Sequence, residues 1–526
     1  MTSTTPRAAR AFAAAAVLLG FVAGAPALAQ SSDTIFSAGF DALAAPSAVP
    51  ATLGFSNVTR QVLDSNHDSA YRFDTVWNDF NADGCPDIFV FGHEDQATSQ
   101  LWINRCDGSH TFTWVSNDAV HYYIPQPTTP RGSGWITLLD FNGDGDQDFF
   151  LRDAGEMGAR YVNDTMGAHV PYFSGKEDGC IHGCAFADID GDNTIDLIHN
   201  DGQITGMLDG QPVVPGLGRT DTFIPMDVDG DGWTDLLEPQ AGGYWHNVHG
   251  QLQWQAAANL GGRPMLHVVA DFDNNGTLDL FTFNGSSEIN GGVHLYRNDG
   301  QGHFTDVTTG SGLAALPFNS YWTSYGNAVA ADFDNDGLPG LLVAGASYAP
   351  SVSVVRNLGG MKFKLADVDL GQAGGGSDAF KSRASVADFD NDGRLDVLKT
   401  QVDTNVGVWR NTTARGLHWM NVRVRGQGLN ADGVGADIKW YRHGTSTLLA
   451  HVWLQANDQH PQTWPHVGLG SADRVDLVVS YPGGGPVVRF DNLAVDQSVV
   501  LYPTGCLLQQ WQPGNGWPMS APATCR

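Results

Sequence analysis

The 526-residue sequence is short of positive charge. It has 28 Lys and Arg against 57 Asp and Glu, which gives a formal net charge of -29. Such an acidic surface repels phosphate backbones and anionic lipid headgroups, so we expect no nucleic-acid partner and no polybasic membrane anchor. Charged residues of both signs make up only 16% of the chain, against roughly 25% in an average soluble domain. The acidity is therefore an excess of Asp over basic residues, which points to acid concentrated in sites.

Long apolar runs are missing beyond the N-terminus. No later segment has 18 uninterrupted apolar residues, so no membrane-spanning helix is predicted there. At the start, Arg7 and Arg10 precede an apolar run from Ala11 to Ala25, and Ala27-Leu28-Ala29 fits the site that signal peptidase cleaves. A membrane anchor is the weaker interpretation, because the run is rich in Ala and broken by Pro26. We predict a signal peptide over residues 1–29 and a secreted or periplasmic protein without a membrane span after cleavage.

Known catalytic motifs are also missing. The sequence has no His-Glu-x-x-His, no Gly-x-Ser-x-Gly and no phosphate-binding Gly-x-x-x-x-Gly-Lys-Ser/Thr. Its 17 His residues show no ligand spacing that singles out a site. We therefore expect no catalytic residues, no organic cofactor and no enzymatic activity.

Cysteines are few but even in number. They fall in three close sequence pairs: Cys85 with Cys106, Cys180 with Cys184, and Cys506 with Cys525. In an oxidising compartment this pattern favours three disulfides, and nearest-neighbour pairing is the simplest of several connectivities. A zinc site at Cys180 and Cys184 is the alternative, but it lacks a second ligand pair at zinc spacing.

What the sequence has in abundance is one Asp-rich motif. The pattern Asp-x-Asp/Asn-x-Asp/Asn-Gly-x-x-Asp, with single departures, recurs seven times, starting at Asp79, Asp140, Asp188, Asp227, Asp271, Asp332 and Asp388. The starts are 39 to 61 residues apart, which leaves room for about four short strands in each unit. A repeat of this period is typical of a propeller. We predict an all-β fold with a seven-bladed β-propeller over residues 52–412, preceded by a linker or first strand over residues 30–51.

The spacing within the motif suits calcium. Ca²⁺ takes about six to eight hard oxygen ligands, and a tight loop supplies them from side chains at positions 1, 3, 5 and 9 and the carbonyl of position 7. Position 6 turns sharply, and it is Gly in six copies and Asn193 in the third. Turn-forming tendency would explain one copy, but seven copies in one register favour ligands. We predict up to seven Ca²⁺, held by Asp79, Asn81, Asp83 and Asp87; Asp140, Asn142, Asp144 and Asp148; Asp188, Asp190, Asp192 and Asp196; Asp227, Asp229, Asp231 and Asp235; Asp271, Asp273, Asn275 and Asp279; Asp332, Asp334 and Asp336; and Asp388, Asp390, Asp392 and Asp396.

Two details of the loops refine this prediction. Gly340 replaces the ninth-position Asp of the loop that starts at Asp332, so we expect that site to be the weakest. An EF-hand would carry Glu at position 12, but only one of the seven loops does, with Glu238. The flanking segments also read as strands rather than helices.

The segments that follow the loops complete a family resemblance. Residues 294–304, 354–363 and 408–411 carry a recurring aromatic or apolar, Arg and Asn pattern. With the loops, they resemble FG-GAP or VCBS repeats, the blades of integrin-α-type propellers. The resemblance implies that each calcium loop joins two strands within a blade.

A second module follows the repeats. Alternating segments at 418–425, 437–441, 474–481 and 487–490 predict a small β-sandwich over residues 415–503. Its Gly-rich segments at 426–436, 467–472 and 475–483 resemble the ASPIC/UnbV domain of the cartilage acidic protein family, although Leu429-Asn-Ala replaces the usual Ser-Asn-Arg. We predict a tail over residues 504–526 that is closed by Cys506 and Cys525.

Taken together, these features favour an exported calcium-binding propeller that acts as a binding or adhesion module. Its partner would be an extracellular protein or a glycan. The alternative is a calcium-dependent lyase or hydrolase that acts on a polysaccharide, because a propeller scaffold does not by itself settle function.

Overall fold

The computed structural model describes most of the chain from residue 52 to residue 509. The described ranges are 52–63, 72–81, 83–92, 100–115, 134–143, 147–153, 158–163, 169–171, 184–199, 201–218, 222–257, 259–264, 266–284, 292–315, 326–344, 352–370, 383–401, 404–414, 416–457 and 465–509. The predicted signal peptide, the predicted linker over residues 30–51 and most of the predicted tail lie outside them. None of the described helices is long and apolar enough to cross a membrane.

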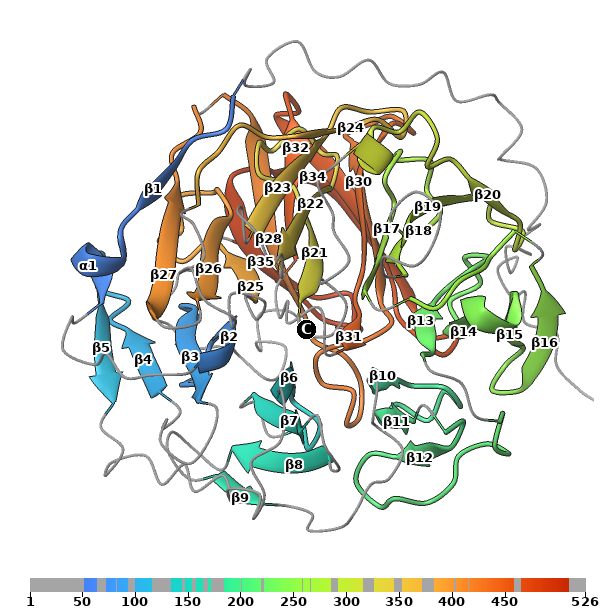
Figure 1. The fold of residues 1–526 in the computed structure, drawn as a ribbon. Coiled ribbons are helices and arrows are strands. Elements are labelled where there is room, and N and C mark those ends of the chain that lie inside the picture. The colour runs from blue at the N-terminus through green and yellow to red at the C-terminus, as the bar shows by residue number, and fades with distance from the viewer. Residues whose placement is uncertain are drawn as a thin grey trace, which may run out of the picture. The chain divides into compact units, whose positions relative to one another are not determined.

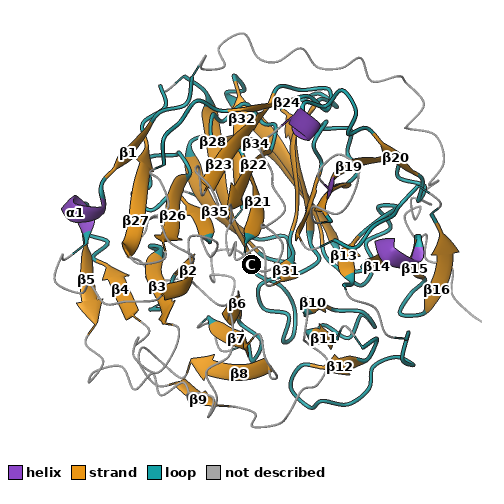
Figure 2. Ribbon diagram, viewed as in Figure 1, coloured by secondary structure: helices purple, strands orange, loops and turns teal. Residues whose placement is uncertain are grey.

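The described chain is built from four-stranded sheets, which confirms the all-β prediction (Figures 1 and 2). Seven of them contain one Asp-rich loop each, and we number these sheets and their loops 1 to 7 in chain order. Sheets 1 to 3 comprise β2 (Arg72–Asn78), β3 (Asp87–Gly92), β4 (Gln100–Asn104) and β5 (Phe112–Val115); β6 (Gly134–Leu139), β7 (Asp148–Asp153), β8 (Gly158–Asn163) and β9 (His169–Pro171); and β10 (Ala185–Ala187), β11 (Asp196–Ile198), β12 (Ile204–Gly206) and β31 (Ala456–Asn457).

The remaining sheets of the repeat region follow the same plan. Sheets 4 and 5 comprise β13 (Ile224–Met226), β14 (Asp235–Glu238), β15 (Gly243–Asn247) and β16 (Leu252–Ala256); and β17 (Leu266–Ala270), β18 (Asp279–Phe283), β19 (Val293–Asn298) and β20 (Phe304–Asp306). Sheets 6 and 7 comprise β21 (Asn327–Ala331), β22 (Gly340–Ala344), β23 (Val352–Asn357) and β24 (Phe363–Leu365); and β25 (Ala384–Ala387), β26 (Asp396–Gln401), β27 (Thr404–Asn411) and β1 (Phe55–Asn57). The described helices are short: α1 (Thr59–Val62), η1 (Pro239–Ala241) and η3 (Leu313–Ala315).

Two of the seven sheets take a strand from elsewhere in the chain. In sheet 7, β1 pairs antiparallel with β27, so Phe55 lies opposite Asn411 (Figure 1). In sheet 3, β31 pairs with β10, so Ala456 lies opposite Phe186. The repeat region is therefore joined to itself at its two ends and also to the module that follows it.

Buried apolar side chains connect each sheet with the next. In sheet 5, for example, Phe281 of β18 packs in one cluster with Leu341 of β22 in sheet 6. Equivalent clusters join sheets 1 and 2, 2 and 3, 3 and 4, 4 and 5, and 6 and 7. One more joins sheet 7 to sheet 1, with Leu398 beside Trp77. The second strand β18 is thus buried on both faces, and all five of its residues are buried rather than alternate ones.

The chain after residue 415 forms two further sheets, which we call the C-terminal module. One comprises β28 (His418–Val424), β32 (His466–Gly470), β35 (Gln497–Leu501) and β36 (Leu507–Leu508), and the other comprises β29 (Asp437–Arg442), β30 (Leu448–Trp453), β33 (Arg474–Ser480) and β34 (Val487–Ala494). Met420, Val422, Ile438, Trp440 and Leu477 belong to one buried cluster between them. Because Met420, Val422 and Val424 of β28 point into this core, Asn421 and Arg423 lie on the other face of the strand.

Candidate metal sites in the Asp-rich loops

Each loop lies between the first and second strands of its sheet, as the family resemblance implied. Loop 5, for instance, starts at Asp271 directly after β17 and ends at Asp279, the first residue of β18. The ninth position opens the second strand in all seven sheets. This position is fully buried in the six loops where it is Asp, with exposed fractions of 0 to 1%.

The backbone of the loops turns twice through the left-handed region. Position 6 has φ between 64° and 91° in the six loops where the structure describes it, including Asn193 at 64° and Gly337 at 91°. This confirms the predicted reason for Gly at that position. Position 4 also has positive φ in the six loops where the structure describes it, for example 76° at Gly191 and 53° at Asn274. The sequence signal for this second turn is the choice of Gly or Asn at position 4.

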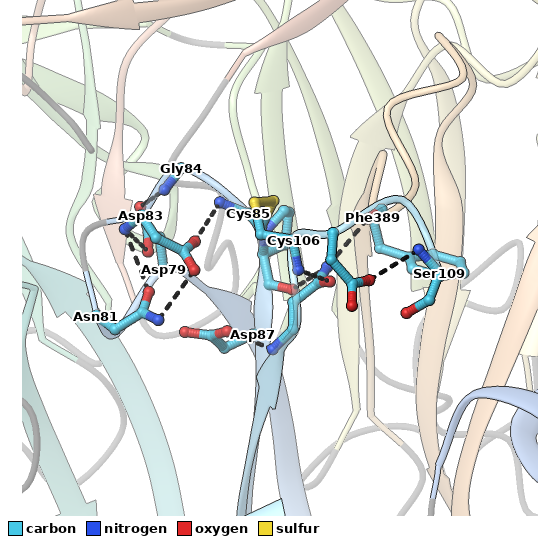
Figure 3. The surroundings of a disulfide bond; sticks show 12 residues. Asp79, Asn81, Asp83, Gly84, Cys85, Asp87, Cys106, Ser109 and Phe389 are labelled. Atoms are coloured by element: carbon cyan, nitrogen blue, oxygen red, sulfur yellow. Dashed lines mark hydrogen bonds between the residues drawn. A yellow bond between two sulfur atoms is a disulfide. The ribbon is translucent and has the colours of Figure 1, made fainter. Parts of the chain in front are cut away.

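The carboxylate at position 1 is held by backbone donors of its own loop. In loop 4, Asp227 accepts hydrogen bonds from Gly230 N at 2.8 Å and from Gly232 N at 3.0 Å. In loop 1, Asp79 accepts from Asp83 N at 2.9 Å and from Gly84 N at 2.7 Å (Figure 3). The same arrangement recurs in loops 3, 5, 6 and 7. The loop therefore closes around this carboxylate.

The carboxylate at position 9 connects the loop to the third strand. In loop 5, Asp279 accepts a hydrogen bond from Phe272 N at 3.0 Å and another from Asn298 N at 3.0 Å. Loops 1, 4 and 7 have the same pair of bonds, with Asn104, Asn247 and Asn411 as the donors on the third strand. In loop 6, Gly340 provides no carboxylate, and a Cβ added there would lie 2.4 Å from Val355 O.

The position-3 carboxylates show whether the donor set of the loops suits a cation. Arg297 Nε lies 2.6 Å from Asp273 Oδ2, and Arg410 Nε lies 2.7 Å from Asp390 Oδ2. In Asp273 and Asp390, the other carboxylate oxygen, Oδ1, is buried and has no hydrogen-bond partner. The same is true of Asp229 Oδ1. A buried acceptor without a donor is costly. A cation in the loop would satisfy these oxygens, so the donor set fits a hard metal ion.

Carboxylates from positions 1, 3 and 9 converge in loops 3, 4 and 5. One oxygen from each lies within 4.8 Å of the others in the set Asp188, Asp190 and Asp196, in the set Asp227, Asp229 and Asp235, and in the set Asp271, Asp273 and Asp279. Oxygens on opposite sides of a Ca²⁺ are separated by roughly this distance, given Ca–O distances of about 2.3–2.6 Å.

The convergence of these groups is electrostatically unfavourable without a cation. Burial, together with the charges of Asp190 and Asp188, raises the pKa of Asp196 to about 8. Burial likewise raises the pKa of Asp235 to about 8 and that of Asp227 to about 7. In loop 7, burial and the charges of Asp390 and Asp392 raise the pKa of Asp388 to about 8. These carboxylates therefore hold protons near neutral pH unless a metal ion replaces them.

A disulfide braces loop 1. Cys85, at position 7 of the loop, is bonded to Cys106, which follows β4, as predicted (Figure 3). Cys184 and Cys506 are also disulfide-bonded. Their predicted partners, Cys180 and Cys525, lie outside the described residues, so those two pairings stay predictions.

The structure thus places the predicted ligands in seven equivalent loops, with Asp144 of loop 2 outside the described residues. Sequence reasoning missed the residues that surround them. The basic side chains His246, Arg297, Arg356 and Arg410 each lie directly before the third-strand Asn, and each contacts the position-3 carboxylate of its own loop. For the three Arg residues, the signal was the recurring Arg-Asn pair, to which the family resemblance assigned no role.

Comparison with known families identifies part of the repeat region. Residues 79–151, 271–343 and 332–398 match the family model of the FG-GAP-like repeat. The chain therefore contains FG-GAP-like repeats. Each matched segment begins at position 1 of a loop, and each ends in the second strand of the next sheet.

Several solved structures align at low identity. A lectin from Agrocybe aegerita that recognises non-reducing terminal N-acetylglucosamine shares 17% identity at a TM-score of 0.41, covering 58% of this chain and 82% of the lectin. The V. cholerae biofilm matrix protein Bap1 shares 13% identity at a TM-score of 0.33, covering 83% of this chain and 70% of Bap1. The Photorhabdus luminescens Tc holotoxin pore shares 13% identity at a TM-score of 0.34, covering 82% of this chain and 21% of that chain. A search of curated protein sequences found no match.

Proposed function

We propose that this chain is an exported calcium-binding protein whose Asp-rich loops hold Ca²⁺ and whose repeat region is a binding module. The observation that carries the calcium assignment is the buried, unpartnered oxygen of Asp229, Asp273 and Asp390. In each of these loops, the carboxylates at positions 1 and 9 accept hydrogen bonds from backbone N–H groups of the loop, which fix their positions. Bound Ca²⁺ would supply the charge that these oxygens lack and would hold the loop closed.

We also propose that the seven sheets are the blades of a seven-bladed propeller. Two observations support this arrangement. The buried clusters run from each sheet to the next and from sheet 7 back to sheet 1. Sheet 7 is completed by β1, which comes from the start of the repeat region. A strand shared in this way would hold the two ends of the repeat region together and would protect a sheet edge.

Thermal unfolding of the full chain tests the calcium assignment. Protein dialysed free of metal is compared with protein in excess Ca²⁺ and in excess Mg²⁺. Each site that binds Ca²⁺ only in the folded state adds about 2.7 kcal/mol when free Ca²⁺ is about 100 times its Kd. We expect a large increase in melting temperature with Ca²⁺ and a smaller one with Mg²⁺, which retains its water ligands more strongly. Equal midpoints with and without Ca²⁺ would rule out the assignment.

A pair of substitutions ties the effect to the loops. Asp235→Asn removes a fully buried ninth-position carboxylate from loop 4, so we expect a smaller calcium-dependent increase. Asp209→Asn is the matched control. Asp209 lies outside the loops and also accepts a backbone hydrogen bond, from Gln211 N at 2.9 Å, but it is exposed. The control variant should respond to Ca²⁺ as the unchanged protein does.

We propose that the module binds an extracellular protein or a glycan and that it carries out no chemistry itself. The disulfides of Cys85, Cys106, Cys184 and Cys506 support an oxidising compartment. In this proposal, the loop carboxylates that could act as acid and base serve as metal ligands instead. Glycan and matrix-protein arrays, probed with and without Ca²⁺, test the binding role. Turnover of a polysaccharide without calcium-dependent binding on either array would favour the enzymatic alternative instead.

A further inference from the structure

The C-terminal module contacts the loops themselves. In loop 2, Asp140 N donates to Asp432 Oδ2 at 2.7 Å. In loop 3, Asn193 O accepts from Leu429 N at 2.9 Å, and in loop 4, Gly232 O accepts from Gly483 N at 3.0 Å. These three contacts use only the backbone of the loops.

In loops 5 to 7, the module contacts the proposed calcium ligands directly. His451 Nδ1 of β30 lies 3.0 Å from Asp271 Oδ2. Gly468 N of β32 donates to Asp332 Oδ2 at 3.2 Å, and Asn421 Nδ2 of β28 lies 3.5 Å from Asp388 Oδ2. All three acceptors are the Oδ2 atoms of position-1 carboxylates. Three strands of the module therefore converge on the same position of three successive loops.

The contact with loop 5 is the most strongly fixed. The His451 side chain is 1% exposed and the Asp271 side chain 0%. On its other side, His451 Nε2 lies 2.9 Å from Asp437 Oδ2, and Lys439 Nζ lies 3.1 Å from the same oxygen. A chain of charged and polar groups within the module thus holds the imidazole against the loop carboxylate.

Such outer partners matter for metal sites. A ligating carboxylate that accepts a fixed hydrogen bond is held in the orientation that coordination requires, and loss of such a partner typically lowers metal affinity about 10- to 100-fold. Asp271 already accepts from Asn275 N and Gly276 N of its own loop. The module adds a third donor to Asp271, from a residue 180 positions away in the sequence.

We propose that the C-terminal module is a structural part of the calcium sites, with His451 and Asn421 as positioning residues for loops 5 and 7. Calcium binding in these loops and docking of the module then stabilise each other. This inference rests on the proposed calcium function. In loop 6, the backbone N–H of Gly468 positions the Asp332 carboxylate in the same way. Gly340 leaves that loop without a ninth-position carboxylate.

Hydrogen exchange of the full chain, followed by mass spectrometry across a Ca²⁺ titration, tests the proposal loop by loop. His451→Leu removes both imidazole nitrogens at nearly constant volume. We expect the calcium concentration that half-protects peptides of loop 5 to rise about 10-fold or more. Loop 3, which the module contacts only through the backbone, should keep its midpoint. Because coupling is reciprocal, Ca²⁺ should also slow exchange in β30 and β32 of the unchanged protein.

Two further variants separate positioning from folding. His443→Leu is the matched control, because His443 makes the same kind of contact within the module, with Nδ1 2.6 Å from Asp476 Oδ1, and no hydrogen bond joins its side chain to a loop in the described part of the chain. Asn421→Ala tests loop 7 independently, should His451→Leu fail to fold. We expect Asn421→Ala to shift the loop 7 midpoint, by a smaller factor because the 3.5 Å contact is longer, and to leave loop 5 unchanged.

The outcomes distinguish this inference from the calcium assignment. If no loop of the unchanged protein is protected by Ca²⁺, the proposed function fails. If the loops respond but neither Asn421→Ala nor His451→Leu shifts its own loop, the coupling fails while the calcium assignment stands. A shift of equal size in the His443→Leu variant would also overturn it, because the effect would then be general destabilisation.

Discussion

Asn104 of β4 in sheet 1 donates from Nδ2 to the carbonyl of Phe389 in loop 7, at 3.1 Å. The same bond joins four other third-strand Asn residues to position 2 of the preceding loop. The pairs are Asn247 with Ile189, Asn298 with Val228, Asn357 with Phe272, and Asn411 with Phe333, at 2.7 to 2.9 Å. Each of these Asn side chains therefore connects two neighbouring sheets at the level of the loops.

We expect Asn298→Ala to destabilise the protein by about 1–3 kcal/mol, because it leaves the buried carbonyl of Val228 without its donor. Asn298 is 0% exposed. Urea unfolding in excess Ca²⁺ measures the change in the free energy of unfolding. Asn259→Ala is the control, because exposed Asn259 makes the same amide-to-carbonyl bond with Phe304 O at 2.9 Å. Equal losses in the two variants would show that the link between sheets adds nothing.

The calcium-free protein should become less stable as pH rises from about 4 to about 8. Burial raises the pKa of Asp196, Asp235 and Asp388 to about 8, well above the usual aspartate value of 3.8. The folded state therefore binds more protons than the unfolded state between these values, and its stability falls as the protons leave. Melting temperatures in metal-free buffers measure the slope. Saturating Ca²⁺ should abolish the fall, and a calcium-free melting temperature that rises with pH would contradict the prediction.

Gly468→Ala should disturb the contact between the module and loop 6. A Cβ at Gly468 would lie 2.2 Å from Asp332 Oδ2 and 2.2 Å from Asn335 C. Overpacking of this kind typically costs about 1–3 kcal/mol. We expect faster hydrogen exchange in β32 and in loop 6, together with a lower melting temperature. Gly416→Ala is the control, because a Cβ there meets nothing within 4 Å.

The loops were predictable from sequence because their chemistry is local. Asp279 and its partner Phe272 N are seven residues apart, and the turn at Asn193 needs only its own φ of 64°. Strand boundaries followed from the same motif, since position 9 opens the second strand. The all-β class was equally accessible, because the apolar segments are short and separated by Gly-rich turns.

The contacts between distant segments were not predictable in the same way. His451 and Asp271 are 180 residues apart, and Asp140 and Asp432 are 292 apart. Nothing in a single sequence says which His faces which Asp, because both residue types are ordinary on a polar surface. The pairing of β31 with β10 in sheet 3 could not be predicted from the sequence for a similar reason. Ala456 and Asn457 form a strand of two residues, too short to show any periodicity.

Removal of the disulfide between Cys85 and Cys106 should lower the stability of the whole protein and should also weaken calcium binding in loop 1. The two residues are 21 apart in sequence, and a crosslink of that span stabilises by about 3 kcal/mol through the unfolded chain. We expect Cys85→Ser with Cys106→Ser to lose roughly that amount in urea unfolding. Because Cys85 also supplies position 7, the calcium midpoint of loop 1 should rise while that of loop 5 stays constant. A double variant as stable as the unchanged protein would contradict the first expectation, and parallel shifts in both loops would contradict the second.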